Sequence, residues 1–450
     1  MPPVPATPSG KPSHFVAWLV GERILRAALS AIVLAAVARH LGPAGFGTLN
    51  LALTLVGLAM PLAQLAAESV VVRELVRRPA EAGALLGSAA ALRFGTGVLC
   101  VAAVQIAALL PGLAPARGAL TAISVLLLIQ ATEVTDLWFR RHVQSRTAVF
   151  ARTTAVLASA ALKLGLVAAG AGVVAFAWVQ VIEGALFSAV LAFAYTRRGG
   201  GPRWHWNTAR LRELWRESRF FALGLFLTGL ALRVDQLAVS WWLGAEAGGN
   251  YFAALRLIEL PVFVATAVAA SLFPAVAGAP TEPQWRRVFA AMSALGWLVA
   301  VGGSACAPWL VPLLFGPAYA DATRAFVLHA WACLHFFLGL ARTQFLVVQH
   351  AAGTQLAVSG ATLALQIALN ATLIPALGVP GAALAYLITQ FAVMWILPFC
   401  LPQLQPCLAW QWQAVRAAWR ADFWRAAATD WRLGRHATLN SPSGPEKSPG

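Results

Sequence analysis

Long apolar stretches dominate this sequence and limit what the chain can fold into. Several run for twenty residues or more with few charges, which is the length a helix needs to cross about 30 Å of hydrocarbon. Hydrophobic residues make up 59% of the 450 and charged residues only 11%, whereas about a quarter of a soluble domain is charged. The composition excludes a soluble globular protein and predicts an all-α polytopic membrane protein.

Twelve membrane-spanning helices can be drawn, with approximate bounds 15–38, 48–70, 84–110, 118–138, 149–170, 173–196, 219–243, 250–277, 288–315, 325–348, 355–376 and 380–402. Arginines concentrate in the loops that follow even-numbered spans, so the positive-inside rule places those loops and both termini in the cytoplasm. The net charge of +16 is therefore explained by the arginines of the cytoplasmic loops, and no nucleic-acid partner is expected. A signal peptide is the alternative for the first apolar run, but Glu22, Arg23 and Arg26 interrupt it and favour a retained span.

The polar stretch 197–218 divides the spans into two lobes of six helices, 15–196 and 219–402. The segment that begins Leu41-Gly42 aligns without gaps with the one that begins Leu243-Gly244, and Gly47 then matches Gly249. Equivalent segments after spans one and seven indicate a parallel repeat about an axis along the membrane normal. Such two-lobed proteins rock one lobe against the other, which is a transporter architecture.

The ends of the chain differ from the spans. Residues 1–14 and 437–450 are polar and rich in Pro and Ser, and they are predicted to be disordered. Residues 403–436 space tryptophans at helical intervals with arginines between them, which predicts an amphipathic cytoplasmic tail. This tail either lies on the anionic leaflet or docks on the helix bundle, and the linker carries a similar tryptophan set.

No enzymatic motif appears, since HExxH, GxxxxGK[ST], GxSxG and a strand-to-helix GxGxxG are all missing. No cofactor is expected, and any uphill transport must draw on an ion gradient, on substrate coupling or on a partner. His329, Cys333 and His335 fall on one span, but only the first two share a face, so a metal site is not predicted.

Charges inside apolar spans are the candidate functional groups, because each costs several kcal/mol in hydrocarbon unless it faces a partner or a wet cavity. Arg26 has Glu22 one turn away for a local ion pair, whereas Arg93 has no local acid and is expected to line a cavity. Lys163 and Glu183 flank a tight turn at similar depths and are expected to meet, either as a structural pair or as cavity-lining groups.

In the second half Arg233 and Asp235 fall in span seven, and Arg256 and Glu259 in span eight. One reading is a salt bridge between Asp235 and Arg256; the other makes Asp235 a cation or proton site and the arginines anion ligands. Four further charges are placed at span ends where water reaches them, namely Glu68, Glu133, Asp136 and Arg342. Buried amides such as Gln105, Gln366 and Asn370 are expected to make interhelical hydrogen bonds.

An ordered set of short motifs resembles the polysaccharide (O-antigen, Wzx-type) flippases of the multidrug/oligosaccharidyl-lipid/polysaccharide exporter superfamily, over about residues 15–402. The set comprises Leu41-Gly-Pro-Ala-Gly-Phe-Gly47, Glu68-Ser-Val-Val-Val-Arg73-Glu74, Arg233-Val-Asp235-Gln236, Leu243-Gly244, Asn250-Tyr251-Phe-Ala-Ala-Leu-Arg256, Ser271-Leu-Phe-Pro274, Leu314-Phe-Gly316-Pro-Ala-Tyr319, Leu369-Asn370-Ala-Thr-Leu-Ile-Pro375 and Gly381-Ala-Ala. The resemblance implies a MATE-like, twelve-helix protein of the bacterial inner membrane that moves undecaprenyl-diphosphate-linked oligosaccharide between leaflets.

The resemblance also implies a central basic cavity, because guanidinium groups bind diphosphate oxygens in a bidentate way. Arg26, Arg93, Lys163 and Arg233 are its candidates, with Arg256 as a further anion ligand, and Asp235 and Glu183 are the candidate ion-coupling residues. The expected partners are lipid-linked oligosaccharide, membrane lipids, and a polysaccharide polymerase or other assembly proteins. A cation-coupled drug antiporter of the same superfamily and a non-transporting scaffold of an assembly complex are the alternatives.

Overall fold

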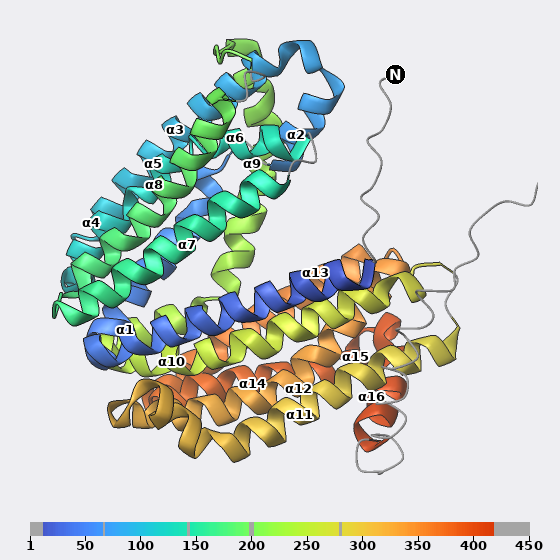
Figure 1. The fold of residues 1–450 in the computed structure, drawn as a ribbon. Coiled ribbons are helices and arrows are strands. Elements are labelled where there is room, and N and C mark those ends of the chain that lie inside the picture. Colours follow the sequence, from blue (N-terminus) through green and yellow to red (C-terminus); the bar gives the residue numbers. More distant parts are fainter. Residues whose placement is uncertain (1–11, 66–67, 142–144, 198–201, 279–280, 418–450) are drawn as a thin grey trace, which may run out of the picture. The chain divides into compact units, whose positions relative to one another are not determined.

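The computed structural model describes residues 12–65, 68–141, 145–197, 202–278 and 281–417, and in this part of the chain every regular element is a helix (Figure 1). Nine helical stretches are long and apolar enough to cross a membrane, and Val379–Trp395 is a shorter apolar helix. Two of the nine, Ser30–Ala63 and Val234–Leu272, each carry more than one predicted span. The prediction of an all-α polytopic membrane protein is confirmed.

The first half of the chain supplies α1 (Pro12–Ala63), α2 (Glu68–Arg77), η1 (Pro79–Glu81) and α3 (Ala82–Ala107). It continues with η2 (Pro111–Ala116), α4 (Arg117–Ser124), α5 (Leu126–Ile129), α6 (Val134–Arg141), α7 (Ser145–Ala168) and α8 (Val173–Arg197). α9 (Thr208–Ala231) and α10 (Val234–Leu272) follow the linker. By packing, the first compact unit extends to Gly249 and includes Leu314–Ala318, so α9 belongs to it; where the functional lobes divide stays a prediction.

Glycine bends α1 and α10 at equivalent positions of the predicted repeat. Gly42 has φ +65° and Gly244 has φ +87°, a backbone region that only glycine enters without strain. Five residues on, a Cβ on Gly47 would lie 1.8 Å from the carbonyl oxygen of Ala245, and one on Gly249 would lie 1.9 Å from that of Pro43. Pro43 and Ala245 are themselves equivalent in the alignment, so the two segments contact each other reciprocally.

Two predicted spans are interrupted inside the membrane part. Span seven is divided between α9 and α10, which are separated by the turn at Leu232 and Arg233. Span four becomes α4, α5 and α6, with a turn at residues 130–133 before α6. Non-helical backbone at membrane depth is tolerated where protein buries it or where it lines a cavity. Each interruption places charged residues beside it, which makes these two turns the places to look for a site.

The second unit begins at Asn250 within α10 and contains α11 (Glu282–Phe315) as far as Leu313. It continues with α12 (Ala320–Val348), α13 (Ala352–Leu377), α14 (Val379–Trp395), α15 (Leu397–Cys400) and α16 (Gln405–Ala417), and with the short turns η3 (Phe273–Ala275) and η5 (Pro402–Leu404). Most of η4 (Pro317–Tyr319) falls in the first unit. Close approach of α13 and α14 depends on Gly381, where a Cβ would lie 2.1 Å from the carbonyl oxygen of Leu373. Small residues at such contacts are typical of membrane helices, which gain from packing and not from exclusion of water.

The sequence left open whether the tail lies on the anionic leaflet or docks on the helix bundle. The contacts of α16 decide this for its own residues. The Trp410 ring stacks on Trp285 of α11 with centroids 6.2 Å apart, and its Nε1 donates to Glu282 at 3.2 Å. Ser293 of α11 donates to the carbonyl oxygen of Ala414 at 3.1 Å. This part of the tail therefore docks on the helix bundle, while residues 418–436 lie outside the described chain.

Candidate functional site

Arg233 stands in the turn that divides span seven and reaches toward the second half of α1. Its Nη1 donates to the carbonyl oxygen of Thr54 at 3.4 Å, and a Cβ on Gly57 would lie 2.7 Å from the same nitrogen. The Thr54 hydroxyl also donates to Oε1 of Gln236, at 3.4 Å. Gly57 thus provides the space in which a guanidinium lies against the helix backbone.

Asp235 is 6% exposed and begins α10, directly after the turn. Its Oδ1 accepts a hydrogen bond from the backbone N–H of Gln236 at 2.8 Å. A carboxylate in the first turn of a helix interacts favourably with the helix dipole, so this position stabilises the negative charge. The Arg-Val-Asp motif therefore places a cation and an anion within three residues at an interruption of the membrane part.

Arg93 lies in α3, is 2% exposed, and belongs to a cluster of charges that comes from four elements. Glu133, in the turn before α6, interacts electrostatically with Arg152 of α7, Arg93, Asp136 of α6 and Glu68 of α2. Two of these acids, Glu133 and Asp136, come from span four and lie at the turn that interrupts it. The acids that accompany Arg93 are thus distant in sequence, which is why no local partner could be found for it.

The placement of four charges at water-accessible span ends is wrong for two of them. Asp136 is 6% exposed and Arg342 is 4% exposed. Arg342 donates from Nη1 to the carbonyl oxygen of Val393 on α14 at 2.7 Å, so a neighbouring helix satisfies it within the second unit. The spacing Glu133-x-x-Asp136 in an apolar run is the sequence signal that could have indicated a buried acidic group.

Lys163 and Glu183 meet as predicted. Nζ of Lys163 on α7 lies 3.6 Å from Oε2 of Glu183 on α8, and the side chains are 21% and 30% exposed. The turn at Gly170, which has φ +69°, returns the chain so that the two residues face each other. Whether the pair is only structural or also takes part in transport stays open.

Arg256 pairs with Glu259 one turn along α10, with Nη1 and Oε1 2.6 Å apart. Asp235 and Arg256 fall in different compact units, so a bridge between them stays a prediction. Arg26 falls in α1, but its side chain lies outside the described part of the structure, and so does that of Glu22.

The second unit buries polar groups that are mostly uncharged. Nε2 of His329 lies 3.1 Å from the Tyr251 hydroxyl, and Trp395 donates to Nδ1 of His335 at 3.3 Å. Within the described residues, no three His, Cys, Asp or Glu side chains are grouped to hold a metal ion.

The amides expected to bond between helices differ in their partners. Gln366 donates to Asn370 on its own helix at 3.3 Å, whereas Gln105 of α3 donates to Ser124 of α4 at 3.0 Å and so makes the predicted interhelical bond.

The sequence of residues 36–324, more than half of the chain, matches the family described as "Polysaccharide biosynthesis protein". The chain belongs to this polysaccharide biosynthesis protein family. The match includes both glycine bends, the two interrupted spans and the Arg-Val-Asp motif, and it confirms the resemblance found in the sequence motifs. No curated protein matches the sequence of this chain.

Solved structures share its fold. An inward-facing multidrug resistance MATE family transporter of the MOP superfamily is 14% identical, with a TM-score of 0.63 over 88% of this chain and 96% of that one. The lipid II flippase MurJ in an inward closed conformation is 10% identical, with a TM-score of 0.63 over 93% and 96%. A MOP superfamily transporter from Pyrococcus furiosus, described as having a binding pocket of reverse polarity, is 14% identical, with a TM-score of 0.55 over 89% and 94%. The chain is thus a member of the polysaccharide biosynthesis protein family with a MATE-like fold, and it has several helices that are long and apolar enough to cross a membrane.

Proposed function

We propose that the protein moves undecaprenyl-diphosphate-linked oligosaccharide from the cytoplasmic to the outer leaflet of the bacterial inner membrane, with both termini in the cytoplasm. The family match over residues 36–324 carries the choice of a polysaccharide precursor over other cargo. The MATE-like fold supports alternating access as the mechanism, in which the lipid tail stays in the bilayer while the head group crosses between the halves. A polysaccharide polymerase and other assembly proteins are its proposed partners.

The proposed ligands of the diphosphate and the sugar are Arg26, Arg93, Lys163, Arg233 and Arg256. Arg233 has the strongest support, because interrupted helices form binding sites in transporters and this arginine stands at such an interruption. Guanidinium binds two phosphate oxygens at once, so a diphosphate head group suits it. Binding would replace the long hydrogen bond to Thr54 by shorter, charge-assisted ones.

Asp235 and Glu183 are the proposed ion-coupling residues. A phosphate that binds Lys163 competes with Glu183 for the same ammonium group, so cargo binding would release a carboxylate able to take a proton or a cation. Asp235 would respond in the same way to cargo on Arg233, two residues before it. In this arrangement, binding of the anionic cargo is coupled to binding of the proton or cation that is carried in the opposite direction.

The cation-coupled antiporter remains the second candidate, and the cluster around Glu133 favours it. Two acids at an interrupted span, Glu133 and Asp136, provide carboxylates at membrane depth. Carboxylates in transmembrane segments mark ion and proton pathways. The scaffold alternative has no comparable observation in its favour.

The test is a deletion strain whose surface polysaccharide and lipid-linked oligosaccharide are measured, the latter separately for each membrane leaflet. We expect loss of the surface polymer and retention of the oligosaccharide on the cytoplasmic side. Normal polymer and normal intermediates, together with increased drug sensitivity, would instead establish the antiporter.

Complementation then examines Arg233 in the same strain. Arg233→Gln should fail to restore the polymer, whereas the matched control Arg287→Gln, which alters an exposed arginine of α11, should restore it. Both variants must reach wild-type levels in the membrane. Full restoration by Arg233→Gln would remove this arginine from the proposed site.

A further inference from the structure

The first three turns of α9 present chemically different faces. Leu214, 1% exposed, and Ala222, 2% exposed, pack into the core formed with α2, α3 and α6. Arg210, Glu213 and Glu217 follow a second stripe, and Arg212, Arg216 and Arg219 follow a third, since residues three and four apart share a helix face. A helix with one packed face has its remaining faces available for other contacts.

The linker holds α9 in one rotation about its axis. Asn207 caps the helix by accepting from the N–H of Ala209 at 2.9 Å, and its own N–H donates to Ser88 of α3 at 2.9 Å. Gly83 and Gly87 of α3 let the linker backbone approach, because a Cβ on them would lie 2.5 Å from the carbonyl oxygen of Arg203 and 2.4 Å from that of His205. The assignment of the three faces is therefore fixed by contacts within the first unit.

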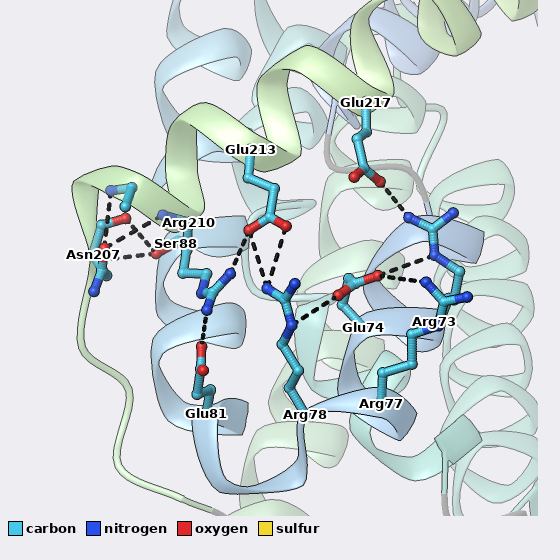
Figure 2. Close-up of polar contacts among 11 residues, drawn as sticks. Arg73, Glu74, Arg77, Arg78, Glu81, Ser88, Asn207, Arg210, Glu213 and Glu217 are labelled. Atoms are coloured by element: carbon cyan, nitrogen blue, oxygen red, sulfur yellow. Dashed lines mark hydrogen bonds and ion pairs between the residues drawn. The ribbon is translucent and has the colours of Figure 1, made fainter.

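The second stripe uses both acids of this part of α9 in ion pairs (Figure 2). Arg78 lies 3.2 Å from Glu213 and 3.5 Å from Glu74, and Arg210 lies 2.5 Å from Glu213 and 2.6 Å from Glu81. Glu217 pairs with Arg73. The hydrogen bond from Arg210 holds the pKa of Glu213 below its ordinary value, so the carboxylate stays ionised within the network.

The third stripe consequently carries positive charge and aromatic rings. Arg212, Arg216 and Arg219 are all exposed, whereas Glu213 and Glu217 are engaged in ion pairs with arginines of the second stripe and of α2. Trp215 is 40% exposed, Phe220 is 70% exposed, and the Arg219 guanidinium lies 4.6 Å from the centre of the Phe220 ring. Trp206 of the linker adds a ring that is 70% exposed.

The spacing of this stripe fits the polar layer of a membrane. Apolar residues of α9 begin at Phe220, so Arg219 marks the boundary of the hydrocarbon. Arg216 lies about 4.5 Å further along the helix axis, within a headgroup layer that is about 5–8 Å thick on each side. Arg212 lies about 10 Å from Arg219, at the outer edge of this layer, and its long side chain can reach back into it. Tryptophans and arginines at this depth are typical of protein surfaces that contact lipid headgroups.

We propose that the third stripe of α9, with Trp206 and Trp215, is a binding surface for anionic phospholipid headgroups of the leaflet on the linker side. The ion-pair network supports it because Glu213 and Glu217 are both paired with other arginines, which leaves the positive charge of the third stripe for the lipid. The proposal rests on the membrane fold and does not depend on the cargo.

The test measures lipid selectivity of the purified full-length protein in phosphatidylcholine vesicles. Nitroxide-labelled phosphatidylglycerol and phosphatidylcholine are compared by electron paramagnetic resonance, which reports the fraction of each lipid immobilised by the protein. The variant is R212Q/R216Q/R219Q. The matched control R197Q/R287Q/R416Q removes three exposed arginines from three different helices.

We expect the wild type to prefer phosphatidylglycerol and R212Q/R216Q/R219Q to lose most of that preference at low salt, since each cation near an anionic surface contributes up to about fivefold in binding. The scattered control should lose less than half as much, and R212K/R216K/R219K should keep the preference because headgroup attraction needs only the charge. Equal losses in the stripe variant and the scattered control would overturn the proposal.

Two other results would also overturn it. A wild-type protein without preference for phosphatidylglycerol would leave the stripe to an acidic protein partner, and failure of R212K/R216K/R219K would point to bidentate recognition in place of headgroup attraction. Elution as a single species and an unchanged unfolding midpoint in detergent establish that each variant is folded, as expected for exposed side chains.

Discussion

The two repeat segments bend the chain in the same way, and all four of their glycines fall in the first compact unit, but the two units bury different chemistry. Gly42 and Gly244 take up the same left-handed conformation, and Gly47 and Gly249 make reciprocal backbone contacts. The first unit buries charges, with Arg93 and Asp136 at 2% and 6% exposure. The second buries His329 against Tyr251 and neutral amides, and its buried Arg342 is held by a backbone carbonyl.

This difference shows that the backbone geometry of the repeat does not determine which polar side chains each unit buries. Close backbone contacts require glycine, because any Cβ would overlap a carbonyl oxygen, whereas the polar groups need only find partners within their own unit. In the proposed function, the charges of the first unit make its interior the part that would respond to anionic cargo or to protons. Three experiments examine this comparison.

Removal of the shared contact should have the largest effect. Gly249→Ala places a Cβ 1.9 Å from the carbonyl oxygen of Pro43, so the helices must separate. We expect the free energy of unfolding to fall by about 3 kcal/mol, measured by denaturant titration in detergent. Gly165→Ala in α7, where no atom lies within 4 Å of the added Cβ, is the control and should be unaffected. Equal unfolding midpoints for the two variants would contradict the reciprocal contact.

Loss of a charge from the first unit should cost more than loss of a neutral group from the second. Arg93→Met leaves the acids around Glu133 without this cation, and we expect about 3 kcal/mol of destabilisation. His329→Phe removes one hydrogen bond to Tyr251 and should cost about 1 kcal/mol. Thermal unfolding in detergent compares them. Adding Glu133→Gln to Arg93→Met should restore part of the stability, and no recovery would mean that the cluster is not coupled.

The ion-pair network of α9 should have the smallest effect and a defined pH dependence. Arg210 lowers the pKa of Glu213 from 4.5, so this carboxylate stabilises the folded state above pH 4.5, and the contribution is lost as the pH falls through the lowered value. Glu213→Gln should therefore cost about 0.5 kcal/mol at pH 7 and progressively less as the pH falls below 4.5. Unfolding midpoints of both proteins across this range measure the difference. A constant difference at every pH would show that packing, and not charge, links α9 to α2.

Sequence alone predicted one contact among the candidate site residues but little of how the others are grouped. The pairing of Lys163 with Glu183 was predicted because a tight turn fixes the relative depth of two adjacent helices. The neighbours of Arg93 were not, since Glu133 and Asp136 approach it only through the interruption of span four. Arg342 was misplaced because a single span does not show which helix covers its end.

The sequence by itself determined the class of the protein, its apolar spans, the repeat and the family, because these depend on composition, periodicity and motifs within short segments. Only the tertiary structure decided that span seven is divided at Arg233, that α16 docks on α11, and which face of α9 points outward. The physical reason is that hydrophobicity fixes which residues enter the membrane, whereas side-chain contacts between distant segments fix which polar groups meet there.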